Sequence, residues 1–330
     1  MSIESFIDLV YQHKSKENKA YETEEKRRVQ LQKLLGDFNP YRNPHMDKSL
    51  VLEEKVELDG YTRERFTFEP VQHLRIIFYV LTPSNNQRTY PSVIALAGHG
   101  EGVKEIVGLD STGNEIEEKD LNDHHFAVQL VRRGIKVFAP ELIGIGERML
   151  PVDQGLRNNS CLSIASKLQL LGLTITGLRV EEIRRLIDVM HAFADVENSR
   201  IGMMGYSGGG VVASYTVALD TRVRGTAILS CANTFFHSLL AINHCIDNYN
   251  PHLLDFGEFY DVLSLIAPRP LFITSGMKDT IFPKTGFLEV VTKLEQLYAE
   301  IGSTTFAHDL FTGGHEVNGR IVFDWMKEQL

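Results

Sequence analysis

A serine flanked by glycines is the residue best suited to chemistry in this sequence. Residues 200–209 read Arg-Ile-Gly-Met-Met-Gly-Tyr-Ser-Gly-Gly, so Ser207 lies in a G-x-S-x-G pattern between a short apolar run and a helical stretch at 210–219. A nucleophile elbow needs this order of strand, turn and helix, because its strained turn lifts the hydroxyl above the sheet and leaves no room for bulky neighbours. The pattern predicts a nucleophilic serine, and the alternative is a glycine-rich turn without chemistry.

A serine hydroxyl is a weak nucleophile at neutral pH, so Ser207 needs a base, and the base needs an acid that orients it. Behind a nucleophile elbow the chain order is serine, then acid, then histidine. Asp279 follows a buried-strand pattern that Gly276 ends, and His315 follows a second strand pattern and two glycines. Alone, Asp279 could be a turn residue and His315 a surface histidine, but their order at strand ends predicts a triad with Ser207. Asp309 lies inside a strand pattern, and we interpret it as structural.

The composition describes an acidic chain with enough apolar residues for a sizeable core. Its 330 residues include 34 Lys and Arg, 43 Asp and Glu and 43% hydrophobic residues, for a net charge of −9. This charge disfavours nucleic acid and anionic membrane surfaces as partners, and no apolar run reaches the ~20 residues of a membrane span. Cys161, Cys231 and Cys245 are widely spaced and indicate free thiols in a reducing compartment. Since the N-terminus shows no signal-peptide pattern, we expect a cytoplasmic protein.

The first quarter of the chain contains two different patterns. Residues 1–36 are polar with spaced apolar positions, and they predict two helices within an N-terminal extension at 1–48. Residues 49–83 instead alternate as strands do, with Asp-Gly at 59–60 between two alternating runs. Because Asp-Gly in this setting is a strong hairpin signal, the segment predicts antiparallel edge strands.

From residue 92 onward, continuous apolar runs alternate with helical patterns, which is typical of a parallel sheet. The predicted strands cover 92–97, 135–140, 200–205, 225–230, 270–275 and 305–311. The predicted helices cover 121–133, 178–195, 208–219 and 284–300, followed by a closing helix within 317–330. The whole pattern predicts one α/β domain over residues 1–330 with a mostly parallel central sheet.

The loop after the first of these strands reads Ala-Gly-His-Gly-Glu-Gly at residues 97–102. Where a nucleophile elbow is present, one backbone N–H from this loop and one from the residue after the nucleophile bind the oxyanion. We assign these donors to Glu101, with Gly102 as the alternative, and to Gly208. His99 either contacts the substrate or holds the loop by a hydrogen bond. A dinucleotide site is disfavoured, because the full glycine fingerprint and a ribose-binding acid are missing.

The sequence resembles the α/β-hydrolases, and more narrowly the dienelactone-hydrolase-related esterases that include the acetyl xylan esterase-like group. Besides the elbow, the resemblance is carried by 96–100 with Lys104-Glu105, the Gly-x-Gly-Glu-Arg loop at 144–148, Arg200-Ile201-Gly202, His244-Cys245 with Asn248-Tyr249 and Pro251, and 267–270. It spans roughly residues 75–325 and implies an α/β-hydrolase fold with a Ser-His-Asp triad and an insertion after the sixth strand. The dienelactone hydrolases proper have a cysteine nucleophile where this chain has Ser207, so their lactone substrate is not carried over.

About forty residues separate the strand patterns at 225–230 and 270–275, and insertions of this length are usually functional. We interpret 232–262, together with 149–176, as candidate lid or specificity segments. The aromatic and polar side chains of the insertion favour a polar or sugar-like ester, although its aromatic residues could instead pack the insertion onto the sheet. The predicted substrate-binding residues are His99, Phe235, Phe236, His244, Asn248 and Tyr249.

A metal ion is not expected, because the histidines, cysteine and aspartate of the insertion match no zinc spacing. These residues are His237, His244, Cys245, Asp247 and His252. The predicted chemistry needs no cofactor either, since a serine triad works by proton transfer and an acyl-enzyme alone.

Together these features predict a serine carboxylic ester hydrolase that cleaves short-acyl, acetyl-type esters of a polar or sugar-like alcohol. One alternative is a peptidase of the prolyl-oligopeptidase type, which shares the catalytic core but carries a propeller-sized domain to gate peptides. The other is a ligand-binding protein on a hydrolase scaffold that has lost its chemistry. The expected partner is a small-molecule ester, without nucleic acid or membrane, and the N-terminal helices could join copies into a homo-oligomer.

Overall fold

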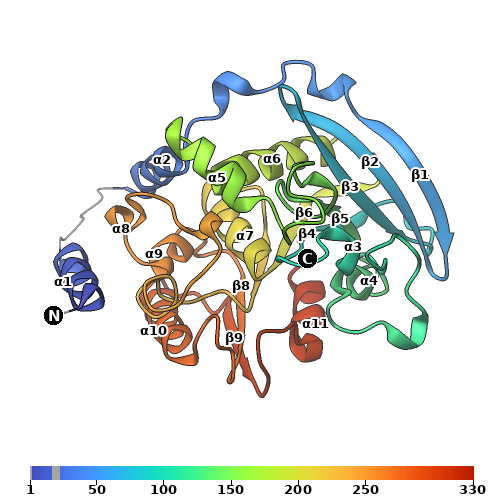
Figure 1. Cartoon of the computed structure of the whole chain (residues 1–330). Helices are drawn as coiled ribbons and strands as arrows, with labels where there is room; N and C mark the ends of the chain where they lie inside the picture. The colour runs from blue at the N-terminus through green and yellow to red at the C-terminus, as the bar shows by residue number, and fades with distance from the viewer. Residues whose placement is uncertain (1, 17–22) are drawn as a thin grey trace.

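A nine-stranded sheet forms the centre of the computed structural model, which describes residues 2–16 and 23–330 (Figure 1). The strand order is β1-β2-β3-β5-β4-β6-β7-β8-β9. The pairs β1–β2, β2–β3 and β3–β5 are antiparallel. All pairs from β5 through β4 to β9 are parallel. The strands are β1 (Val51–Leu58), β2 (Tyr61–Val71), β3 (Leu74–Pro83), β4 (Tyr90–Leu96), β5 (Lys136–Pro140), β6 (Val196–Tyr206), β7 (Gly225–Leu229), β8 (Leu271–Gly276) and β9 (Phe306–Phe311). This is the predicted α/β-hydrolase sheet with its antiparallel edge.

The antiparallel edge begins with the hairpin that the sequence predicts. Gly60 has a φ of 82°, a conformation that glycine adopts without a steric penalty, and Leu58 pairs with Tyr61 across the turn. β1 is mostly exposed, whereas β2 buries one face. The hairpin therefore extends the sheet away from the parallel strands that carry the predicted catalytic residues.

Helices cover both faces of the sheet (Figure 1). One face is covered by α6 (Ile175–Met190), α7 (Gly208–Leu219), α9 (Phe259–Ser264) and α10 (Lys284–Glu300). The other is covered by α3 (Val103–Ile106), α4 (Phe126–Val131) and α11 (Gly319–Gln329). The remaining helices are α1 (Ile3–Lys16), α2 (Glu24–Leu35), α5 (Cys161–Leu170) and α8 (Leu253–Phe256), with short 3-10 turns η1 (Asn39–Tyr41), η2 (Met46–Lys48), η3 (Glu118–Asp120), η4 (Gly146–Arg148) and η5 (Ile246–Asn248).

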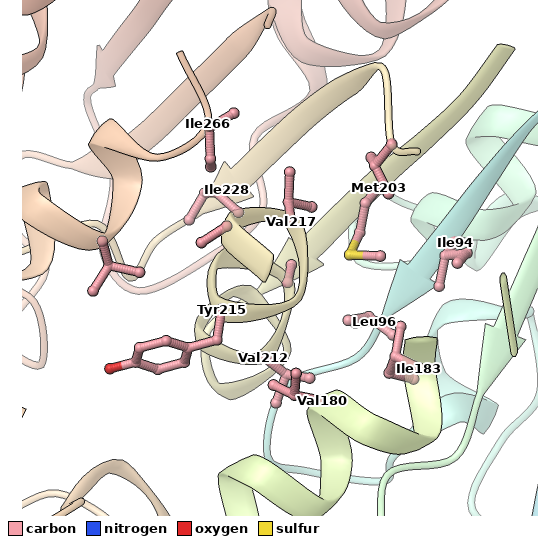
Figure 2. Packing of buried hydrophobic residues seen from close by; sticks show 14 of the residues in the cluster. Ile94, Leu96, Val180, Ile183, Met203, Val212, Tyr215, Val217, Ile228 and Ile266 are labelled. Carbon is pink, nitrogen blue, oxygen red and sulfur yellow. The ribbon is translucent and has the colours of Figure 1, made fainter. Parts of the chain in front are cut away.

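Alternating side chains of the buried strands feed two separate cores. Ile94 and Leu96 of β4 enter the core beneath α6 and α7, whereas Val93 and Ala95 enter the core beneath α4 and α11. This division follows from the two-residue period of a strand that is covered on both faces. In Figure 2, Leu96 lies near the side chains of α6, which pack against α7. The parallel strands are thereby held rigidly, with their carboxyl ends at one edge.

Two predicted helices have different boundaries in the structure. α4 covers only 126–131 of the predicted 121–133, because Asn122 accepts the backbone N–H of His124 and keeps the preceding turn out of the helix. α6 begins before the predicted residue 178, since the Thr174 hydroxyl accepts the Gly177 N–H as an N-cap. It ends at Met190, where a tight turn leads into β6.

The N-terminal extension contains the two predicted helices, although residues 1 and 17–22 of the predicted segment lie outside the described part of the chain. α2 is anchored by Arg28, whose guanidinium donates to the carbonyls of Ala218 and Leu265. α1 contacts the insertion, since the Tyr11 hydroxyl donates to Glu258 at 2.9 Å. Self-association through these helices stays a prediction.

Within the described ranges, no single helix combines the length and the apolar composition needed to cross a membrane. Only α5 and α6 together meet those two criteria, and they are bent by 98° at the break between them. The cytoplasmic location therefore stays a prediction.

Candidate active site

The turn between β6 and α7 has the backbone geometry of a nucleophile elbow. Ser207 has φ 52° and ψ −123°, a strained conformation for a residue with a side chain. A Cβ at Gly205 would lie 2.5 Å from the Gly209 carbonyl oxygen, and one at Gly209 would overlap the carbonyl of Leu96. Neighbouring backbone therefore leaves no room for a side chain at Gly205 or Gly209, which explains why the motif has glycine at these positions.

The three predicted triad residues form one hydrogen-bonded chain. Ser207 Oγ lies 2.8 Å from His315 Nε2, and His315 Nδ1 lies 2.8 Å from Asp279 Oδ2. The second Asp279 oxygen accepts the backbone N–H groups of Ile281 and Phe282 at 2.8 and 2.9 Å. The Asp279 side chain is 0% exposed, and that of His315 is 18% exposed. This is the arrangement of side chains that acyl transfer by a serine requires.

Aromatic rings hold the imidazole of His315 in place. Phe282 stacks on it with ring centroids 5.7 Å apart, and Tyr206 lies on it at 5.2 Å while its hydroxyl donates to the His315 carbonyl. His244 lies 5.0 Å from Phe282, and its buried Nε2 has no hydrogen-bond partner. Burial lowers the pKa of His244. A neutral His244 therefore offers an unpaired polar atom close to the triad.

The loop after β4 lies directly against the elbow. A Cβ at Gly98 would be 3.0 Å from Ser207 Cβ, and a Cβ at Gly208 would be 2.8 Å from Nδ1 and Cε1 of His99. The loop therefore borders the turn that carries Ser207. Glu101 is exposed and lies on this loop. Its role as an oxyanion donor together with Gly208 stays a prediction.

The buried carboxyl group of Glu141 contacts the end of this loop. Its Oε1 accepts the Val103 N–H at 3.1 Å, whereas its Oε2 is buried without a partner. Side chains at Gly102 or Gly146 would collide with the Glu141 carboxylate, so both glycines are needed for the carboxylate to fit. Burial raises the pKa of Glu141 to about 8, although the Val103 N–H and the charge of Arg148 oppose the shift. Glu141 therefore joins the loop after β4 to the turn η4.

His99 belongs to a second hydrogen-bonded chain beside the elbow. Its Nε2 lies 2.9 Å from Asp247 Oδ2, and Arg179 NH1 lies 2.5 Å from the same oxygen. Burial opposes protonation of His99, but hydrogen bonds with Asp247 and Cys161 outweigh it and raise the pKa of His99 to about 9. The Arg179 charge keeps the pKa of Asp247 below its usual range despite burial. His99 thus has a structural anchor as well as a place at the site.

The predicted substrate-binding residues of the insertion are divided by the structure. Phe235 and Asn248 are buried and line a small cavity next to Phe282. Phe236 instead stacks on Tyr11 of α1 at 4.6 Å. The Tyr249 hydroxyl donates to the carbonyl of Leu239, so Tyr249 braces the insertion. Phe236 and Tyr249 therefore make contacts that pack the insertion, and their role in substrate binding stays a prediction.

Two cavities border this region, and a third lies farther along the insertion. The smallest, about 10 Å³, lies between Val211, one turn after Ser207, and Phe282. A polar pocket of about 710 Å³ includes Gly100 and Glu101 of the loop after β4. A more apolar pocket of about 620 Å³ lies between α1 and residues 239–255, away from the triad. The first cavity therefore adjoins the helix that follows Ser207, and the second adjoins the loop after β4.

Sequence reasoning missed Arg179, Cys161 and Glu141 as residues that organise the site. Arg179 lies in a helix whose apolar spacing predicts a buried face, and the arginine itself is only 2% exposed. A charged residue at a core-facing helical position was the available signal, because such a charge needs a buried partner. Glu141 directly follows strand β5 and gave the same kind of signal.

Residues 9–210 match the sequence profile of the Abhydrolase family. Because this match covers more than half of the chain and includes the elbow, the chain belongs to that family. The sequence is also 28% identical over 286 residues to the Bacillus subtilis (strain 168) protein named "Putative hydrolase YtaP", covering 84% of this chain and 88% of that protein.

Solved structures with the same fold include proteins described as esterases. A "putative acetyl xylan esterase" from Bacteroides fragilis NCTC 9343 has a TM-score of 0.77 at 16% identity, covering 92% of this chain and 86% of that chain. A glucuronoyl esterase from Solibacter usitatus has a TM-score of 0.67 at 15% identity, covering 92% of each chain. At these identities the similarity establishes the α/β-hydrolase fold, and the activity has to be argued from the site.

Proposed function

We propose that this protein is a serine carboxylic ester hydrolase that uses Ser207, His315 and Asp279 as its catalytic triad. The observation that carries the proposal is the pair of 2.8 Å contacts that link Ser207 Oγ through the imidazole to Asp279. The strained backbone at Ser207 supports the same role, because such strain persists in proteins chiefly where function requires it.

In this mechanism, Ser207 Oγ attacks the ester carbonyl carbon while His315 Nε2 takes the hydroxyl proton. Asp279 holds the Nδ1–H tautomer and stabilises the imidazolium that forms. The N–H groups of Gly208 and Glu101 bind the oxyanion of the tetrahedral intermediate. His315 then returns the proton to the departing alcohol, and water activated by the same histidine releases the acid from the acyl-enzyme.

The small cavity beside Val211 supports a short acyl group. Its volume of about 10 Å³ leaves little more than the space of one water or methyl group. Phe282 closes it next to His315, and Phe235 lines its other side. An acetyl methyl fits such a space, whereas each further methylene would need the rings to move. We therefore propose acetyl-type esters as the preferred acyl class.

The polar pocket supports a hydrophilic alcohol. Its lining includes Lys104, Gln154, Arg157 and Asn158 as well as the backbone of Gly100. These donors and acceptors suit hydroxyl groups better than hydrocarbon. The solved neighbours described as acetyl xylan and glucuronoyl esterases act, by those names, on carbohydrate esters. We propose a sugar-like alcohol for this chain on the combination of the pocket and that likeness.

The first test is the loss of activity in Ser207→Ala, measured on a chromogenic acetyl ester. Removing one triad member should lower kcat by on the order of 10³-fold or more while the protein stays folded. Ser214→Ala is a matched control, because Ser214 lies on the helix that follows Ser207 and its hydroxyl donates to the Gly210 carbonyl. A folded Ser207→Ala protein with the activity of this control would refute the proposal.

A further inference from the structure

Four side chains that can bind metal ions meet between the loop after β4 and the two candidate lid segments. One ligand atom from each of His99, Cys161, Cys245 and Asp247 lies within 4.8 Å of the other three. His99 comes from the loop after β4, Cys161 begins α5, and the other two flank the start of η5. We call these four residues the four-ligand cluster. Only Cys245 and Asp247 belong to the set that the sequence offered for a metal.

Two donor-to-donor distances in the four-ligand cluster fall in the range expected around a tetrahedral zinc ion. Zinc–ligand bonds of ~2.0–2.3 Å at tetrahedral angles place neighbouring donor atoms roughly 3.3–3.8 Å apart. His99 Nε2 lies 3.6 Å from Cys161 Sγ, which lies 3.3 Å from Asp247 Oδ2. The 2.9 Å contact between His99 and Asp247 is shorter, as expected where a proton bridges the two atoms. Small side-chain shifts would complete the tetrahedron.

The donor types also select among metal ions. Two thiol sulfurs with one imidazole and one carboxylate suit zinc, whereas calcium and magnesium prefer ligand sets made only of oxygen. Cys161 and Asp247 are buried, and Cys245 is half-buried. The His99 side chain is 25% exposed, so the cluster is not fully enclosed.

Arg179 supplies the charge that such a complex needs. Two thiolates and a carboxylate around Zn²⁺ carry a net charge of −1, which one guanidinium neutralises. Arg179 NH1 lies 2.5 Å from Asp247 Oδ2, and NH2 lies 3.2 Å from Cys161 Sγ. Asp247 is the one ion-pair partner that the described residues give to this arginine. Arg179 therefore occupies the position of an outer partner that orients two ligands, as metal sites commonly use.

We propose that the four-ligand cluster binds one zinc ion in a closed, structural site. The ion displaces the two thiol protons and the proton shared by His99 and Asp247, and these protons pass to solvent. Because four protein ligands fill the coordination sphere, the ion has no open position for the ester. His99 then carries its remaining proton on Nδ1, the ring edge that lies against Gly208.

Zinc at this position would join three separate segments next to Ser207. It would tie the start of α5, in segment 149–176, and η5, in segment 232–262, to the loop that borders the oxyanion region. The ion would thus set how firmly both candidate lids are held. This inference does not depend on ester hydrolysis, and its test measures metal and stability.

The experiment is metal analysis of the full-length protein, purified without chelator from cells supplied with zinc. We expect about one zinc per chain, because four donors complete one ion. Thiol titration of the denatured protein after chelation should find all three cysteines reduced. Replacement by Co²⁺ should produce thiolate-to-cobalt charge-transfer absorption. Zinc near background after incubation with Zn²⁺, with no rise in Tm, would overturn the proposal and leave a network of protonated thiols. One free thiol per chain would overturn it in favour of a disulfide.

Two variants keep the result specific to the four-ligand cluster. Cys245→Ser removes a half-buried ligand and should lower zinc content and abolish the cobalt charge-transfer change. Cys231→Ser is the matched control, because Cys231 is a buried free thiol outside the cluster and should retain full zinc content. If Cys245→Ser does not fold, His99→Gln supplies the same test from the exposed side. Equal zinc content in these variants and the control would contradict the site.

Discussion

Two histidine–aspartate pairs flank Ser207, and they differ in what surrounds them. His315 and Asp279 are 2.8 Å apart, and His99 and Asp247 are 2.9 Å apart. The far nitrogen of His315 contacts the Ser207 hydroxyl. His99 instead contacts the backbone of the elbow, and its aspartate is fixed by a buried arginine.

The difference shows that a histidine–aspartate contact does not by itself define a catalytic base. Asp279 satisfies its second oxygen with backbone N–H groups, so its charge remains available to the imidazolium that forms on His315. Asp247 is already neutralised by Arg179 and is surrounded by thiols. The first pair is therefore suited to proton transfer, and the second to holding a loop and a lid.

The two pairs can be distinguished by making the same aspartate-to-asparagine substitution in each. Asp279→Asn should lower kcat by up to ~10⁴-fold, because it favours the wrong His315 tautomer while preserving the geometry. Asp247→Asn should act mainly on stability, by roughly 3–5 kcal/mol, since it leaves Arg179 buried without a counter-charge. Kinetics and urea unfolding of both variants test this. If the two variants lost kcat equally at unchanged stability, the pairs would have the same role.

A second, smaller effect concerns the acyl cavity. In a series of esters from acetate to octanoate, kcat/KM should fall with acyl length. The transition-state free energy should rise by roughly 1–3 kcal/mol for each of the first misfit methylene groups. Val211→Ala widens the cavity and should improve butyrate relative to acetate. A preference of the unmodified protein that rises with chain length would instead indicate an open, lipase-like groove.

A third expected effect, on stability and not on catalysis, is the pH dependence due to Glu141. Its folded pKa of about 8 exceeds the ordinary 4.5, so the folded protein keeps a proton that the unfolded chain releases between these values. The stabilisation is complete below pH 4.5 and is lost as the pH rises through 8. Glu141→Gln cannot ionise, so its stability relative to the unmodified protein should increase from about pH 5 to about pH 8. Urea unfolding of both proteins at the two pH values checks this. An equal difference in unfolding free energy at about pH 5 and at about pH 8 would show that Glu141 has no raised pKa.

The sequence predicts the parallel strands and the position of Ser207 because their signals are local. Asp279 and His315 could be predicted because each follows a strand whose carboxyl end lies at the same edge of the sheet. The second pair could not, since Asp247 lies in an irregular insertion, and its contact with His99 depends on how that insertion folds back. The contact between Phe236 and Tyr11 could not be predicted for the same reason, because Tyr11 is in the N-terminal extension.

Covalent labelling by a small organophosphonate tests the central claim most directly, because such a reagent traps an activated serine. Intact-mass and peptide mass spectrometry should show a single adduct on the Ser207 peptide, with parallel loss of esterase activity. Ser207→Ala should remain unlabelled, whereas Ser214→Ala should react as the unmodified protein does. Labelling that persists in Ser207→Ala, or ester turnover by a protein that the reagent never modifies, would contradict the assignment of Ser207 as the nucleophile.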